Sequence, residues 1–151
     1  MYKLLPTLLF VIIGYSSSAQ FIARVEMKEA IPGICNKDEV YALFNSFRGQ
    51  GEPVCPITKE EILKRLNAEV SFLKDKPKYK DKGMVGLIIN CKAEVIQCKM
   101  DGKTKSTELD KQIEAVFNSL GVWKEGRLNG AAVDASVLFS FKIKKGVFVF
   151  E

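Results

Sequence analysis

The chain has 151 residues, a length typical of one domain. Its composition, 47% hydrophobic and 27% charged with a net charge of +5, is that of a globular protein and argues against disorder. The sequence contains no histidine. This excludes Ser-His-Asp and Cys-His catalysis, together with any metal site that needs an imidazole ligand.

Residues 1–19 have the pattern of a secretory signal peptide. Lys3 precedes an apolar run over residues 4–15, and small residues follow as far as Ala19. We expect cleavage between Ala19 and Gln20, which leaves an exported protein, periplasmic or secreted. The alternative is an uncleaved membrane anchor, although the run is shorter than the roughly 20 apolar residues that a span needs.

Residues 20–57 form a predicted N-terminal segment that is mostly irregular, because prolines and glycines recur from residue 30 onwards. Alternating apolar residues predict a strand over 21–27, and the apolar patch 40–44 predicts a second, short one. A helix is predicted over 58–74. Thr58 and Glu61 have capping-box spacing at its start, and apolar residues then recur at helical intervals.

The run 74–82 carries five lysines and two aspartates. One interpretation is a basic patch for phosphate or acidic lipid. The preferred one is a solvated connection that Pro77 keeps out of a helix. No aromatic ladder accompanies the lysines, so the run does not predict nucleic-acid binding.

Two apolar runs, 84–90 and 95–100, predict a β-hairpin. A second helix is predicted to begin at Ser106 or Thr107, with Asp110 as a capping-box partner, and to stop at Gly121.

The long alternating segment 133–143 predicts a strand with one buried and one mostly wet face, and 147–150 predicts a further extended piece. The order helix, strand, strand, helix, strand therefore predicts an α+β domain over 58–151. We expect two helices to pack on a three-stranded, mainly antiparallel sheet.

The four cysteines are predicted to form two disulfides, because an exported protein occupies an oxidising compartment. Three pairings are possible. Cys91 and Cys98 would lie too far apart within the predicted hairpin, which favours crosslinks from the segment of Cys35 and Cys55 onto it. Zinc is the competing interpretation, but no C-x-x-C pair occurs.

Residues from about 82 to 141 contain a succession of motifs. Gly83 or Gly86 opens a strand of the hairpin, and the later positions are Leu109, Asp110, Trp123, Gly126, Asn129, Gly130 and Val133. This succession resembles the C-terminal domain of TonB-type energy transducers, in the divergent form found among Bacteroidetes. The chain has Glu125 where the family usually has a proline. From the residues alone, we expect Trp123 to lie in the core and Gly126 and Gly130 to permit tight turns.

The resemblance implies a non-enzymatic protein-interaction domain, without cofactor or metal, that binds a protein or extended peptide such as the plug of an outer-membrane transporter. TonB-like domains do so by adding the peptide to a sheet edge. The strand 133–143 is the predicted edge, with Ser136, Ser140 and Lys142 as its contact residues. Two alternatives are an anchored energy transducer and a small secreted enzyme that uses a thiol or carboxylates.

Overall fold

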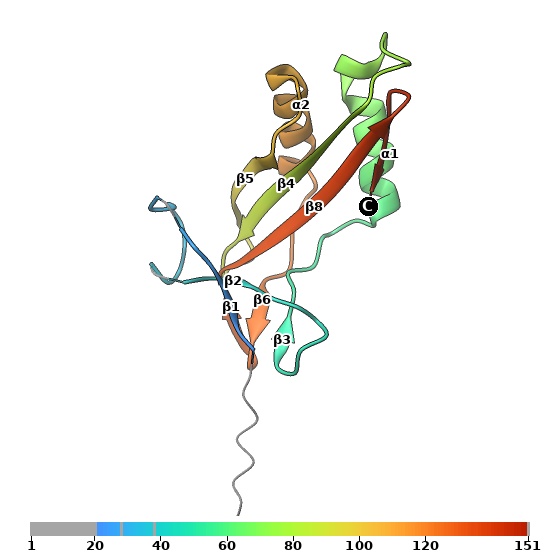
Figure 1. The fold of residues 1–151 in the computed structure, drawn as a ribbon. Coiled ribbons are helices and arrows are strands. Elements are labelled where there is room, and N and C mark those ends of the chain that lie inside the picture. Colours follow the sequence, from blue (N-terminus) through green and yellow to red (C-terminus); the bar gives the residue numbers. More distant parts are fainter. Residues whose placement is uncertain (1–20, 28, 38, 151) are drawn as a thin grey trace, which may run out of the picture.

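The computed structural model describes residues 21–27, 29–37 and 39–150. Within them, two α-helices, one 3₁₀ helix and two β-sheets make an α+β fold (Figure 1). The larger sheet has the order β1-β2-β8-β4-β5, with β9 also paired to β8. Its strands are β1 (Ala23–Val25), β2 (Val40–Ala42), β4 (Asp81–Ile89), β5 (Val95–Gly102), β8 (Ala135–Lys144) and β9 (Val147–Phe150). The smaller sheet consists of β3 (Gln50–Gly51), β6 (Gly126–Leu128) and β7 (Ala131–Val133).

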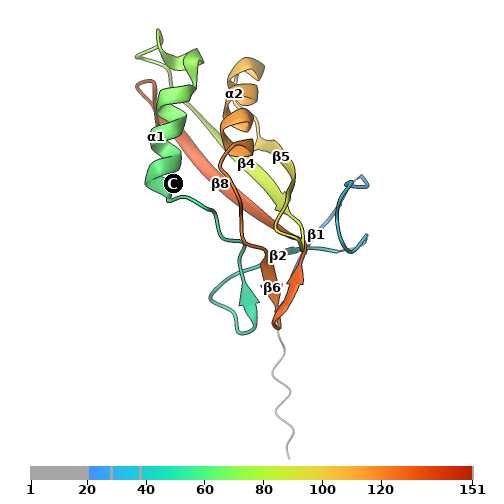
Figure 2. The ribbon, with the colours of Figure 1, turned by 180° about the vertical axis from the view of Figure 1, so that it is seen from behind.

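Helices α1 (Lys59–Glu69) and α2 (Thr107–Asn118) lie on the same face of the larger sheet (Figure 2). Each begins where a side chain accepts a backbone N–H: Thr58 from Glu61 and Ser106 from Leu109. The first predicted helix is therefore confirmed, but its last turn is a separate 3₁₀ helix over Ser71–Leu73.

The three-stranded sheet predicted from the sequence is wrong, because the larger sheet has six strands among the described residues. The predicted trio does form its antiparallel centre, in the order β5-β4-β8. The N-terminal segment adds β1 and β2, and β2 runs parallel to β8. The extended piece at 147–150 folds back on β8 as β9.

The main hydrophobic core lies between the two helices and the central strands. Apolar residues of α1 and α2 meet Val85, Leu87 and Ile89 of β4 and alternate residues of β8. The predicted alternation of β8 is confirmed, since Phe139, Phe141 and Ile143 are buried. Leu138, pointing to the helix-free side, is 57% exposed. Only one face of this sheet is covered by helices.

Strands β6 and β7 form a hairpin where the sequence predicts only a turn. Asn129 and Gly130 both have positive φ, 52° and 84°, which confirms the predicted tight turn at this pair. Gly126 has a different role from the predicted one. A Cβ there would come within 2.8 Å of both the Ala135 Cβ and the Leu43 Cδ1, so this glycine permits close packing of β6 rather than a turn.

None of the helices among the described residues is long and apolar enough to cross a membrane. The predicted signal peptide at 1–19, with its cleavage site, lies outside the described residues.

Candidate functional site: the open edge of β8

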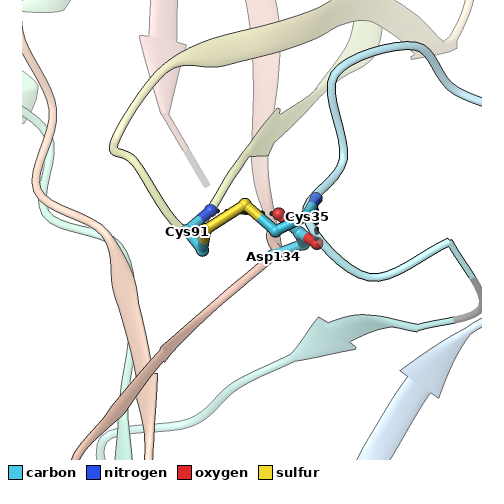
Figure 3. Close-up of side chains that lie close together, drawn as sticks. All are labelled: Cys35, Cys91 and Asp134. Atoms are coloured by element: carbon cyan, nitrogen blue, oxygen red, sulfur yellow. Dashed lines mark hydrogen bonds between the residues drawn. A yellow bond between two sulfur atoms is a disulfide. The ribbon is translucent and has the colours of Figure 1, made fainter.

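A disulfide joins Cys35, in the N-terminal segment, to Cys91, just after β4 (Figure 3). It closes a sequence separation of 56 residues. This pairing agrees with the expected crosslink from the N-terminal segment onto the hairpin. It fixes the segment that leads into β2 against the end of β4.

Asp134 lies beside this disulfide and is only 2% exposed. Its Oδ2 accepts hydrogen bonds from the backbone N–H of Cys35 at 2.8 Å and of Asn36 at 2.9 Å. Its Oδ1 accepts one from the N–H of Cys91 at 3.0 Å. The carboxylate therefore binds the backbone on both sides of the disulfide, and these bonds offset the cost of its burial.

The sulfur atoms of the two cysteines and a carboxylate oxygen of Asp134 all lie within 4.8 Å of one another. In the structure, however, the two sulfurs are bonded to each other, and both carboxylate oxygens accept N–H groups. A metal needs thiolates and free oxygen lone pairs. As observed, these three residues form a structural crosslink. The alternation predicted for 133–143 would put Asp134 on the wet face of the strand, so the sequence contained no signal for this role.

The prediction of a second disulfide is wrong, because Cys55 and Cys98 are free thiols. Burial, together with the nearby carboxylate of Glu114, raises the pKa of the Cys98 thiol to about 12. Burial also raises the pKa of Cys55. Both groups therefore stay protonated, and weakly nucleophilic, at neutral pH.

The residues that carry the family resemblance have structural positions. Leu109 is fully buried in the main core, and Trp123, 3% exposed, meets the ring of Phe139 edge to face. Asp110 is not the predicted capping-box partner of Thr107. Its Oδ1 instead accepts hydrogen bonds from the backbone N–H and the hydroxyl of Thr104. Val133 is the last residue of β7 in the smaller sheet, and only Asp134 separates it from the start of β8.

Strand β8 is not the simple edge strand that the sequence predicts. On one side, β4 pairs with it from Ala135 to Ile143. On the other side, β2 pairs with its first two residues, and β9 pairs with residues 141–144. Among the described residues, no strand pairs with that second side over Val137–Ser140. We call this stretch the open edge of β8.

The backbone groups of Leu138 and Ser140 face the open edge. Lys145 and Gly146, both with positive φ, form a two-residue turn, so Lys144 and Val147 make the hydrogen-bonded pair next to it. Alternate residues of a strand direct their backbone groups to the same side, which places those of residues 142, 140 and 138 on the β9 side. The Asp134 carbonyl follows the same alternation and points to this side, because it accepts the N–H of Tyr41 in β2.

The open edge lies beside a pocket of about 160 Å³. Leu138, Phe139 and Ser140 of β8 line it together with Phe150 of β9 and Lys59, the first residue of α1. The pocket therefore combines the exposed apolar side chain of Leu138 with the positive charge of Lys59.

The three predicted contact residues are not brought to one place. Ser140 lies at the open edge, whereas the Ser136 hydroxyl donates to the Tyr41 carbonyl in β2. Lys142 pairs with Val149 of β9 and lines a different pocket. The periodicity of the strand predicts a contact role for Ser140, but it contains no signal for Lys59 or Phe150, which come from other elements.

The outer edge of β5 differs from the open edge of β8. There the Glu114 Oε1 on α2 accepts the backbone N–H of Met100 at 2.8 Å. A charged side chain that occupies a strand's outward backbone group is a known way to prevent pairing with another chain. This leaves the open edge of β8 as the better placed of these two for an added strand.

Comparisons with known protein families, with curated proteins and with solved structures found no match for this chain.

Proposed function

We propose that this protein is a binding module that takes up an extended peptide segment of a partner protein at the open edge of β8. The observation that carries the proposal is the break between β2 and β9, where β8 lacks a strand neighbour over Val137–Ser140. An incoming segment would accept and donate the backbone hydrogen bonds that Leu138 and Ser140 direct there. This is β-strand addition, which supplies affinity through the main chain.

Side-chain selectivity would come from the walls of the pocket. Leu138 and Phe150 offer apolar contact, and Lys59 offers a cation to a carboxylate on the segment. The stretch spans only four residues between the two flanking strands, so the bound segment is short. We therefore expect a peptide with an apolar residue next to an acidic one, or ending in its own carboxylate.

The proposal agrees in mode of binding with the TonB-like resemblance, which stays a prediction. The Cys35–Cys91 disulfide is compatible with the predicted export, because such crosslinks persist in oxidising compartments.

The test compares two substitutions at one position. Ser140→Pro removes the N–H that faces the open edge and leaves the hydrogen bonds to β4 in place, whereas Ser140→Ala keeps the N–H and removes only the hydroxyl. Peptides are selected from a random library on the wild-type protein and their affinities measured by fluorescence anisotropy. We expect the alanine variant to bind within about twofold of wild type and the proline variant to bind at least about tenfold more weakly, the loss of one or more hydrogen bonds.

Circular dichroism melting of both variants controls for folding. Equal binding of the selected peptides to the proline variant and the wild type would show that they do not add to β8. Amide hydrogen exchange gives a second reading, because bound peptide should protect the amides of Leu138 and Ser140 specifically.

A further inference from the structure

We propose that the end of the larger sheet farthest from the disulfide binds a small soluble compound carrying a diphosphate group. A pocket of about 330 Å³ opens there, lined by Lys80, Asp81, Lys82, Lys105, Lys142, Ile143 and Lys144. Five lysines and one aspartate give this lysine pocket a formal charge of +4. The site is separate from the open edge of β8 and does not depend on peptide binding there.

The lysines converge from separate parts of the chain. Lys80 lies in the loop before β4, and Lys82 lies at the start of β4. Lys142 and Lys144 lie at the end of β8, and Lys105 lies in the segment before α2. The sequence shows only the run 74–82, for which a solvated connection is the preferred interpretation. Folding adds three lysines from more distant positions to two of that run.

The register of the sheet places like charges face to face. Lys82 of β4 lies directly opposite Lys142 of β8 in the antiparallel ladder. Cross-strand pairs of like charge destabilise a sheet. An anion bound between the two strands would be attracted by both ammonium groups.

The loop that carries Lys80 is held in place. The Tyr79 carbonyl accepts the N–H of Gly146 in the β8–β9 turn, and the Tyr79 hydroxyl donates to Asp81 Oδ2 at 2.8 Å. Phe72 packs edge to face on Tyr79, and the Lys76 Nζ lies 3.4 Å from the centre of the Phe72 ring. The pocket is thus formed before a ligand arrives, which lowers the entropic cost of binding.

The single acid of the pocket is already engaged. Asp81 Oδ2 also accepts the N–H of Lys105 at 2.9 Å, and its Oδ1 accepts the N–H of Lys82. Its carboxylate therefore orients the backbone from which two of the lysines project.

The chemistry of the lining selects the class of ligand. Lysine ammonium groups act as mobile point charges and bind phosphate. The lining includes no arginine and no aromatic ring, which argues against stacked nucleobases. A charge of +4 in this volume matches a compact anion with several charges, and a diphosphate provides that.

Isothermal titration with inorganic pyrophosphate at low salt tests the proposal on the full chain. The variant Lys82→Gln/Lys144→Gln removes one charge from each strand. The control Lys64→Gln/Lys111→Gln removes the same charge from the exposed sides of the helices. We expect the first variant to bind at least about tenfold more weakly and the control to stay within about twofold. Raising the ionic strength should weaken wild-type binding.

Thermal melting separates lost binding from lost folding. Because Lys82 faces a like charge, its replacement should leave the melting temperature unchanged or raise it. The variant Lys82→Arg/Lys144→Arg keeps both charges and should retain binding. No measurable binding of pyrophosphate, or equal weakening in the control variant, would overturn the proposal. Tighter binding of oligothymidylate than of pyrophosphate would overturn it too, in favour of a nucleic-acid backbone.

Discussion

Two regions of this protein are stabilised in different ways. The helix-covered region, formed by α1, α2 and the strands beneath them, is held by a large core of fully buried apolar side chains. The N-terminal region, residues 21–57 with the β6–β7 hairpin, has a small core centred on Tyr41, Leu43 and Ala135. It depends instead on the Cys35–Cys91 disulfide and on the carboxylate of Asp134. A region with little apolar surface to bury needs specific bonds to hold one conformation.

The largest expected effect comes from removing a large buried side chain from the main core. Phe117 is fully buried and its ring lies 5.1 Å from that of Phe139. We expect Phe117→Ala to lower the free energy of unfolding by about 3–5 kcal/mol, measured by urea denaturation. Val122→Ala is the control, since Val122 is 84% exposed, and should change it by no more than about 0.5 kcal/mol. A small effect at Phe117 would mean that this region is not held by burial.

Removing the disulfide should act mainly on the N-terminal region. We expect Cys35→Ser/Cys91→Ser to cost about 2–4 kcal/mol, because the unfolded chain gains entropy when the crosslink is lost. Hydrogen exchange should accelerate in residues 29–45 and stay unchanged in α1 and α2. Cys55→Ser is the matched control. Equal acceleration in both helices would show that the two regions unfold as one unit.

Asp134→Asn tests the hydrogen bonds by which the Asp134 carboxylate holds the N-terminal region. The amide retains an acceptor but loses the charge, and its NH₂ group faces backbone donors, so we expect a cost of about 1–3 kcal/mol. The amides of Cys35, Asn36 and Cys91 should exchange faster. The exposed Asp101 provides the control substitution Asp101→Asn. Unchanged exchange at those three amides would contradict the assigned role of the carboxylate.

The smallest expected effect concerns the thiol of Cys98, which packs against the main core. The pKa of Cys98 is raised from 9.0 to about 12 by burial and by Glu114, so its neutral form is favoured in the folded state. The resulting stability is fully present below about pH 9 and is lost as the pH rises towards 12. Cys98→Ala should remove this alkaline loss without changing the pH dependence near neutrality, as followed by denaturation at several pH values.

Alkylation by iodoacetamide gives an independent reading of the same thiol. Native Cys98 should react slowly at pH 8, and denaturation without reductant should expose two reactive thiols. Four reactive thiols would contradict the disulfide, and none would contradict the free state of Cys55 and Cys98.

The predicted elements that agree with the structure are those with strong local signals. The cap at Thr58, the apolar periodicity of α1 and α2, and the Asn129-Gly130 turn each follow from residues near in sequence. Strand β3 was missed because it is short and pairs only with the distant β6, and β6 was missed because its hairpin with β7 has only three residues on each side. The third predicted strand corresponds to β8, but the prediction that it is an edge strand is wrong. Nothing in the local sequence indicates that β2 and β9 pair with it.

The sequence by itself determined the two helices, the antiparallel hairpin and the alternating long strand, because hydrophobic period and capping act over a few residues. It also favoured two crosslinks from the segment of Cys35 and Cys55 onto the hairpin, of which the structure contains one. Only the tertiary structure decided which cysteines pair, where β8 is left open, and that Lys105, Lys142 and Lys144 join Lys80 and Lys82. These features depend on contacts between residues far apart in the chain, which local patterns do not specify.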